Sequence, residues 1–280
     1  MSPMSSTGIP KRSVNSRDSI PADTAPPEAR QVPAARRALD IIELVAQERQ
    51  LKHTDIAERL DIPKSSATLI LDTLVRSGYL QRDPLSRAYS VGSRILAIAG
   101  RYLSDMDIVQ ISQPVLSRLV VDVDESAFLV HAEGDEVVVL WREVCKRRLN
   151  YTFALGERAP IALTAGGLAL LAMRPAAGWR RTLAACGLAD EKTVRRLLAE
   201  LEAIAGGAMA ATSQGHVQEV SSFALPIVNA QGAPVAAVSM AIPAQRMNAA
   251  LRQRVERALR QAQREIAPQA GLAGLHSPGA

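Results

Sequence analysis

Cysteine and aromatic residues are scarce in this chain of 280 residues. Its cysteines, Cys145 and Cys186, lack zinc-type C-x-x-C spacing, which argues against a disulfide framework or a cysteine-ligated metal site. Aromatic side chains form 3% of the sequence, so a core must rest on Leu, Val, Ile and Ala. We expect ordinary buried thiols in a protein of the reducing cytoplasm.

Long hydrophobic runs are absent too. Residues 1–33 are rich in Ser, Pro and Arg but contain no apolar stretch of signal-peptide length, and no later run approaches the length that spans a membrane. We therefore expect a disordered tail over residues 1–33, a flexible tail over residues 268–280, and no membrane partner.

A recognisable catalytic set is also missing. The histidines, His53, His131, His216 and His276, stand in no GxSxG, HExxH or Cys/His arrangement. The glycine pair at 166–167 is followed by no Lys-Thr pair, as a phosphate loop requires, and is too isolated for a dinucleotide fingerprint. The sequence predicts no catalytic residue, no metal ligand and no cofactor.

The chain does have the length for about two domains and an excess of positive charge. The formal net charge is +5, and the isoelectric point is near 9.5. Charge of this size points only weakly to an anionic partner, because many enzymes are as basic. The positions of the basic residues must therefore decide.

Helical signals begin near Ala34. ARRALDIIELVAQ predicts a first helix, with an apolar stripe formed by Leu39, Ile42, Leu44 and Val45. Thr54 suits the N-cap of a short second helix that ends near Leu60. Pro63 suits the opening turn of a third helix.

The third helix should bury Ala67, Leu71 and Leu74, which fall at i, i+4 and i+7, and should end at Gly78. Its outer face carries few charges and consists of Ser65, Ser66, Thr68, Leu69, Asp72, Thr73 and Arg76. YLQRDPLSRAYSV then predicts a hairpin around an Asp-Pro turn. Two helices, a turn, a helix and a hairpin form a winged helix-turn-helix, which we assign to residues 34–91.

This order suggests what the outer face contacts. Amides at a helix N-terminus, together with Lys64, Ser65 and Ser66, suit a DNA phosphate. The following turns would meet base edges in the major groove, through methyl contacts to thymine or through hydroxyl contacts. The base-facing residues are Thr68, Leu69, Asp72 and Thr73, and the other predicted DNA contacts are Arg36, Arg37, Thr54, Arg76, Arg82 and Arg87. The alternative is a solvated helix in a protein-binding domain.

The second half of the chain mixes strands and helices. After a linker helix at 92–104, we expect a domain over 105–267 with a helix interrupted or restarted at Pro114. Strands are expected at 126–132, 136–144, 221–228 and 234–242, with helices from Thr164, at 179–186 and 191–205, and to Ile266. Neighbouring strands joined by short turns indicate an α+β domain with a mainly antiparallel sheet.

RRALDIIELV, TDIAERLDIPKSSATLILDTLVRSGYLQRD and YSVGSRIL together resemble the winged-helix half of the isocitrate-lyase-regulator (IclR) family of bacterial transcription factors. The resemblance covers residues 32–103 and extends more loosely into the second half. It implies an α/β (α+β) protein with a GAF-like effector domain that binds double-stranded DNA and a small organic acid. The family commonly has a basic residue where this chain has Leu69, so the operator sequence cannot be transferred.

LGERAPIALTAGGLALLA resembles the loop and helix with which the family binds its effector. Thr164 would cap that helix, whose bare N-terminus suits a carboxylate. The effector-binding residues implied by the resemblance are Leu155, Gly156, Thr164, Ala165, Thr212, Ser222 and Ser239. Relatives often have an acidic residue at the position of Thr212 and a glycine at the position of Glu219. A Glu219 carboxylate inside the pocket would repel an acid unless it pointed outward or held a proton. The small residues also suit close packing of a helix on a sheet.

Three hypotheses follow. The leading one is a ligand-responsive regulator that binds a pseudo-palindromic promoter site as a homodimer pairing into a tetramer. The second is a ligand-independent regulator with a degenerate pocket, and the third is an enzyme carrying an accessory helical domain.

Overall fold

The computed structural model describes residues 32–213 and 219–270, and the chain divides into two compact units, Met1–Ile95 and Leu96–Ala280. The tails expected at 1–33 and 268–280 lie largely outside the described residues. Where they are described, residue 33 begins the first helix and residues 268–270 continue the last one. No described helix combines the length and apolar character needed to cross a bilayer.

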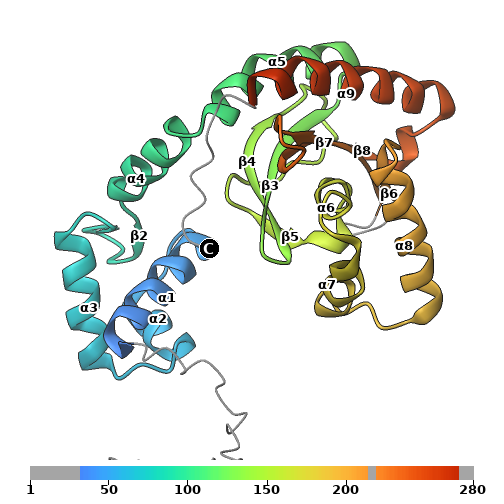
Figure 1. Cartoon of the computed structure of the whole chain (residues 1–280). Coiled ribbons are helices and arrows are strands. Elements are labelled where there is room, and N and C mark those ends of the chain that lie inside the picture. Colours follow the sequence, from blue (N-terminus) through green and yellow to red (C-terminus); the bar gives the residue numbers. More distant parts are fainter. Residues whose placement is uncertain (1–31, 214–218, 271–280) are drawn as a thin grey trace, which may run out of the picture. The chain divides into compact units, whose positions relative to one another are not determined.

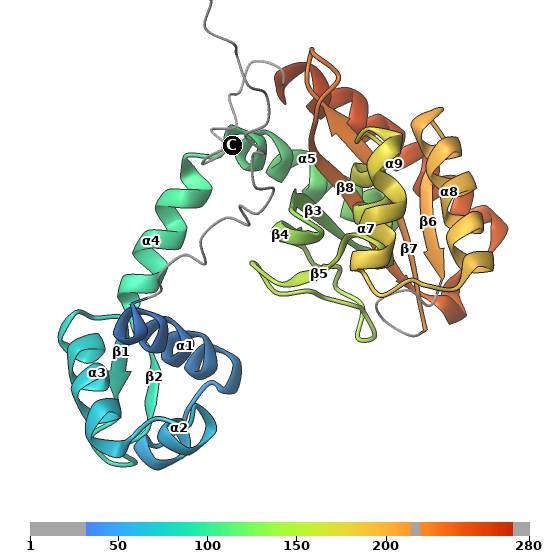
Figure 2. The same ribbon diagram turned by 60° about the horizontal axis from the view of Figure 1, so that its bottom comes forward.

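The first unit is a winged helix-turn-helix (Figure 2). Its elements are α1 (Pro33–Glu48), α2 (His53–Arg59), α3 (Lys64–Arg76), β1 (Leu80–Arg82) and β2 (Tyr89–Val91). Ala67, Leu71 and Leu74 of α3 are buried as expected, in a core shared with Ile41 and Ile56. The order predicted from the sequence is confirmed.

Two local predictions in this unit are wrong. Leu39 of α1 is 56% exposed, whereas Ile41 and Val45, one helical turn apart, form the buried stripe. Thr54 is not the N-cap of α2, because the helix already begins at His53. The Asp55 carboxylate closes this end instead, accepting the backbone N–H of residue 52 at 3.3 Å.

The end of α3 is joined tightly to the hairpin and to the following helix. Gly78 has φ of +77°, which glycine adopts without strain. The helix ends with two backbone hydrogen bonds, from the Gly78 N–H to the Val75 carbonyl and from the Tyr79 N–H to the Leu74 carbonyl. The Gly78 carbonyl also accepts the N–H of Arg94 at 3.1 Å. A Cβ on Gly92 would lie 2.2 Å from that carbonyl oxygen, so only glycine fits this approach.

The second unit is built on a six-stranded antiparallel sheet with the order β5-β4-β3-β8-β7-β6. Its strands are β3 (Ser126–Glu133), β4 (Glu136–Glu143), β5 (Arg158–Pro160), β6 (Ala210–Ser213), β7 (Val220–Val228) and β8 (Pro234–Pro243). The sheet curls strongly, and α6 lies inside the curl (Figure 1). The α+β architecture with a mainly antiparallel sheet is confirmed.

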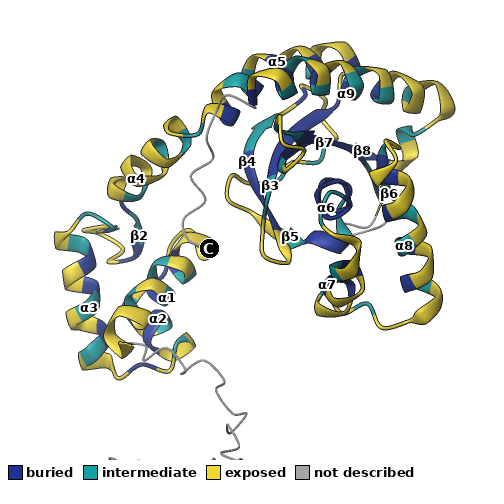
Figure 3. Ribbon diagram, viewed as in Figure 1, coloured by how far each residue is buried: buried dark blue, intermediate teal, exposed yellow. Residues whose placement is uncertain are grey.

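Helices cover both faces of the sheet. They are α5 (Asp107–Val123), α6 (Ala165–Leu171), α7 (Trp179–Ala185), α8 (Glu191–Ala205) and α9 (Ala249–Ala270). The helix α4 (Ser93–Ser104) precedes them along the chain and has no buried residue. The strands alternate between two cores: Ala127 and Leu129 of β3 pack toward α5 and α9, and Phe128 and Val130 pack toward α6. Figure 3 shows α6 as buried, unlike the outer sides of α5 and α9.

Proline does not break the helix predicted to be interrupted. Pro114 lies inside α5, which runs on for nine more residues to Val123. A proline inside a helix costs about 3 kcal/mol or more. Buried side chains on both sides of it, including Ile108, Leu116 and Leu119, offset that cost by packing in the core with α9.

Candidate nucleic-acid interface and ligand pocket

The outer face of α3 is open to solvent. Ser65, Thr68, Leu69, Asp72, Thr73 and Arg76 are exposed, and Ser66 is half-buried. Leu69 is 71% exposed, so its apolar side chain is open to a partner. The structure thus brings the residues predicted to meet DNA bases onto one surface of one helix.

Hydrogen bonds restrain the hydroxyl groups on this face. Thr68 Oγ1 donates to the carbonyl of Lys64 at 2.9 Å, and Thr73 Oγ1 donates to the carbonyl of Leu69 at 2.8 Å. The half-buried ring of His53, at the start of α2, places Nε2 2.9 Å from the same Thr68 Oγ1. His53 was not among the predicted DNA contacts.

The predicted basic contacts differ in their surroundings. Arg36 forms an ion pair with Asp40 at 2.9 Å, and the Arg82 guanidinium lies 5.6 Å from the centre of the Tyr89 ring. Lys64, Arg76, Arg37 and Arg87 are exposed, as is Thr54, whose hydroxyl donates to Asp55 at 3.3 Å. Exposed Lys and Arg side chains of this kind are the groups with which proteins neutralise nucleic-acid phosphates.

The turn between β1 and β2 is shaped by Asp83. Its carboxylate accepts the backbone N–H of Ser86 at 2.6 Å, the Ser86 hydroxyl at 2.9 Å and the N–H of Leu85 at 3.0 Å. These bonds, the Ser86 backbone bond foremost, hold the pKa of Asp83 below its usual value. The turn thereby presents Arg87, whose φ is +56°.

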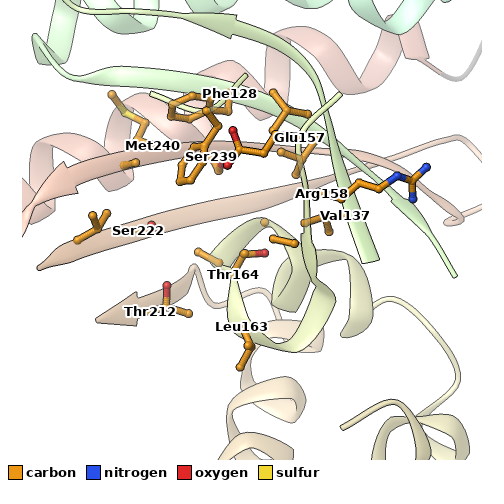
Figure 4. A pocket seen from close by; sticks show the side chains of 18 residues that line it. Phe128, Val137, Glu157, Arg158, Leu163, Thr164, Thr212, Ser222, Ser239 and Met240 are labelled. Atoms are coloured by element: carbon orange, nitrogen blue, oxygen red, sulfur yellow. The ribbon is translucent and has the colours of Figure 1, made fainter. Parts of the chain in front are cut away.

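A pocket lies between α6 and the concave face of the curled sheet (Figure 4). About 630 Å³ of space not filled by protein atoms borders its lining, and this volume includes open solvent at its mouth. Its apolar wall includes Phe128, Val130, Val137, Val139 and Phe153. The rings of Phe128 and Phe153 meet edge to face, with centroids 5.1 Å apart.

Hydroxyl groups form another wall, and strand register explains why they meet. Thr212 of β6 lies directly opposite Ser222 of β7, and Ser239 of β8 lies opposite Phe128 of β3. All four line the pocket. Because side chains alternate between the two faces of a strand, Ser222 lies on the same face of β7 as Val220 and Ala224, which pack toward α6. Five of the predicted effector-binding residues therefore line one cavity: Thr164, Ala165, Thr212, Ser222 and Ser239.

The start of α6 closes the pocket. Thr164 caps the helix as predicted, its Oγ1 accepting the Gly167 N–H at 2.9 Å. A Cβ on Gly167 would lie 2.0 Å from the Ile161 carbonyl oxygen, and one on Gly166 would lie 2.6 Å from Val130 Cγ2. Both glycines thus permit close packing, the alternative that the sequence left open, and Gly166 also lines the pocket.

Leu155 and Gly156 do not line the pocket. Leu155 is 46% exposed, and Gly156 has φ of +77° at the tip of the loop that precedes β5. Its N–H donates to Val139 at 2.8 Å, so its contribution is to the shape of the loop. Glu219 is exposed, has φ of +63° and is not part of the lining, so its carboxylate is outside the pocket.

Sequence reasoning missed the two charged residues of the lining, Glu157 and Arg158. Figure 4 shows the Glu157 carboxylate near Phe128 and Ser239, and the Arg158 guanidinium pointing away from Thr164 and Thr212. Arg158 forms ion pairs with Glu133 and, at 3.1 Å, with Glu136. Hydrogen bonding to Glu133 foremost raises the pKa of the guanidinium. If residues 156–160 (GERAP) had been interpreted as a short edge strand, the alternation of side chains along it would have predicted that either Glu157 or Arg158 faces the interior of the domain.

The pocket can bind a compact, largely apolar molecule and position it through hydroxyl groups. Among the described residues, no three His, Cys, Asp or Glu side chains are grouped as metal ligands would be. The hydroxyl and apolar side chains of the lining offer hydrogen bonding and apolar contact.

Residues 34–84 match the profile of the IclR helix-turn-helix domain, and residues 100–268 match that of the bacterial transcriptional regulator IclR C-terminal domain. The Pca regulon regulatory protein of Pseudomonas putida is 29% identical over 214 residues, covering 73% of this chain and 72% of the relative. For the HTH-type transcriptional regulator BhcR of Paracoccus denitrificans the identity is 28%, with coverages of 83% and 85%. A solved IclR homologue complexed with 4-hydroxybenzoate, from Microbacterium hydrocarbonoxydans, has a TM-score of 0.71 at 25% identity and coverages of 86% and 100%.

Proposed function

The chain belongs to the IclR family of bacterial transcriptional regulators, and we propose that it binds a pseudo-palindromic promoter site under the control of a small aromatic carboxylic acid. Family membership makes it a DNA-binding regulator with an effector domain, and not an enzyme. The class of effector, the symmetry of the site and the residues at each interface are our proposal.

The observation that carries the effector class is the composition of the pocket. The edge-to-face pair of Phe128 and Phe153 suits a flat ring, and the hydroxyls of Thr164, Thr212, Ser222 and Ser239 suit polar substituents. The solved homologue complexed with 4-hydroxybenzoate, an aromatic acid, supports this class of ligand.

Electrostatics suggests how the acid is oriented. Because Arg158 is already paired with carboxylates, we assign the ligand carboxylate to the pocket hydroxyls and to the N–H groups at the start of α6 other than that of Gly167, which Thr164 Oγ1 accepts. Glu157 would repel a carboxylate but would accept a hydrogen bond from a hydroxyl substituent. We therefore place the acid group near Thr164 and a ring hydroxyl near Glu157.

Promoter binding would use two copies of the chain. One winged helix covers one half-site, so a pseudo-palindrome requires at least a homodimer. Exposed apolar side chains on α1 and α4, namely Leu39, Leu96, Ile98 and Tyr102, offer surface for pairing. A homodimer that pairs into a tetramer remains our expectation.

In this mechanism the acid favours one arrangement of the effector domains. The linker helix α4 transmits that arrangement to the two winged helices and so sets the distance between the DNA half-sites that they bind. To shift promoter occupancy strongly, the acid must discriminate between the two arrangements by a few kcal/mol. A ligand-independent regulator would have the same fold and no such discrimination.

Fluorescence anisotropy tests the proposal with duplexes from the region upstream of the gene and with shuffled duplexes. We expect preference for one upstream fragment, a negative slope of log affinity against log salt, and a shift of that affinity by 4-hydroxybenzoate or benzoate. 4-Hydroxybenzamide, which lacks the carboxylate, is the matched control. Equal affinity for upstream and shuffled duplexes, with and without acids, would contradict the proposal; specific binding that no acid alters would favour the ligand-independent regulator.

A further inference from the structure

The third helix presents a hydrogen-bonding surface that is smaller than its sequence suggests. The hydroxyls of Thr68 and Thr73 each donate to a backbone carbonyl one turn earlier, at 2.9 and 2.8 Å. A threonine hydroxyl has a single proton. Neither hydroxyl can therefore donate to a base without giving up its helix bond.

The acceptor side of Thr68 is also engaged. Its proton is directed to the Lys64 carbonyl, so the contact with His53 Nε2, at 2.9 Å, requires that Nε2 carry a hydrogen and donate it. Two helices thus hold the Thr68 side chain in one rotamer. Oγ1 can therefore accept one further hydrogen bond but cannot donate one, and the exposed methyl is the group of Thr68 that offers apolar contact.

Apolar groups then dominate the centre of the face. Leu69 is 71% exposed, and Thr73 lies one turn further along the same side. Because the Thr73 hydroxyl donates to the Leu69 carbonyl, the methyl group of Thr73 is the branch of this side chain that offers apolar contact. Asp72 is an exposed polar side chain beside Leu69 and Thr73, and Arg76 lies in the last turn of the helix.

Resting on the proposed function, we propose that α3 reads its half-site mainly through the 5-methyl groups of thymine, with His53 as a positioning residue. In the major groove, thymine is the base that presents a methyl group, and Thr methyl or other apolar side chains contact it. The residues that would contact thymine are Thr68, Leu69 and Thr73. Specificity then arises from apolar contact and not from hydrogen bonds donated by hydroxyls.

Replacing thymine with uracil tests this inference, because uracil keeps every hydrogen-bonding group and lacks only the methyl. The full-length protein is first used to select a preferred duplex from a random pool, and each thymine of that duplex is then replaced singly. We expect at least two positions in each half-site at which uracil lowers affinity 3- to 10-fold. If base-pair exchanges weaken binding and no uracil does so by more than 1.5-fold, the inference is overturned while the proposed function stands. If no sequence is enriched, both fall.

A matched pair of variants assigns the effect to the side chain. T68V keeps a methyl and loses the hydroxyl, so it should preserve the preference for thymine over uracil. T68S keeps the hydroxyl and loses the methyl, so it should abolish that preference at one position per half-site. Thermal unfolding and affinity for random duplex control for folding. Loss of the preference in T68V with retention in T68S would overturn the inference.

His53 requires a readout that a merely structural role would not alter. H53A should reduce the ratio of thymine to uracil affinity at the Thr68 position two-fold or more and leave affinity for random duplex unchanged. H53Q, whose amide can still donate to Oγ1, should restore the ratio. An unchanged ratio in H53A would remove His53 from the inference.

Discussion

Thr212 lies directly opposite Ser222 across the ladder between β6 and β7, and both line the pocket beneath the start of α6. If these hydroxyls bind the acid, T212V and S222A should each lower its affinity about 2- to 10-fold, the range of a lost net hydrogen bond of about 0.5–1.5 kcal/mol. Because the two are neighbours, the double variant should not be additive. Calorimetric titration with 4-hydroxybenzoate measures both quantities. Wild-type affinity in the double variant would place the acid elsewhere.

Ser239 offers a way to fill the pocket. Its Oγ would lie 3.8 Å from a Cβ on Gly166, so the larger side chain of S239L would extend into the space under α6. We expect S239L to abolish the response to the acid and to keep affinity for the promoter within two-fold. Promoter anisotropy with and without the acid reports both. A preserved response would show that the effector site lies elsewhere.

Arg158 provides the opposite prediction. Its guanidinium is engaged by Glu133 and Glu136 and points away from Thr164 (Figure 4). R158M should therefore change the affinity for the acid less than three-fold, in spite of the lost positive charge. A loss of ten-fold or more in the same titration would mean that the guanidinium turns inward when the acid binds.

Gly167 sets the distance between α6 and the preceding turn. In G167A the new Cβ would lie 2.0 Å from the Ile161 carbonyl oxygen. Overpacking of this kind lowers the free energy of unfolding by about 1–3 kcal/mol. Chemical denaturation should show this destabilisation. G100A in α4 is the control, since nothing lies within 4 Å of its Cβ and alanine favours a helix by up to about 1 kcal/mol. Equal stability of the two variants would refute the packing role.

Lys64 and Arg76 flank the apolar centre of α3. K64A and R76A should weaken binding to specific and random duplexes alike, and each should reduce the salt slope by about one. R195A, which removes the same charge from an exposed position on α8, is the control and should leave both unchanged. An unaltered salt slope in K64A and R76A would contradict the proposed DNA face.

Local sequence patterns predicted what local physics determines. Helical periodicity identified the buried side of α3, and Thr164 was recognised as a cap because the bond it makes spans three residues. The strands β5 and β6 escaped prediction because Arg158–Pro160 and Ala210–Ser213 are too short to show a period. They form by pairing with β4 and β7, which sequence periodicity does not reveal.

The sequence predicted the hydroxyl residues of the pocket but not the aromatic and acidic residues that face them. Thr212, Ser222 and Ser239 were assigned by resemblance, and strand register explains their meeting. Phe128, Phe153 and Glu157 come from a strand and a loop that face them across the cavity, a relationship fixed by the curl of the sheet. The helix through Pro114 was mispredicted because its stability comes from packing on α9.

The contact between Gly92 and Gly78 makes the first turn of α4 mechanically continuous with the end of α3. The Gly78 carbonyl accepts the Arg94 N–H at 3.1 Å, and the Tyr79 carbonyl accepts the Gly92 N–H at 2.8 Å. We therefore expect the end of α3 and the first turn of α4 to move as one body, because separating them would break the hydrogen bond between the Gly78 carbonyl and the Arg94 N–H.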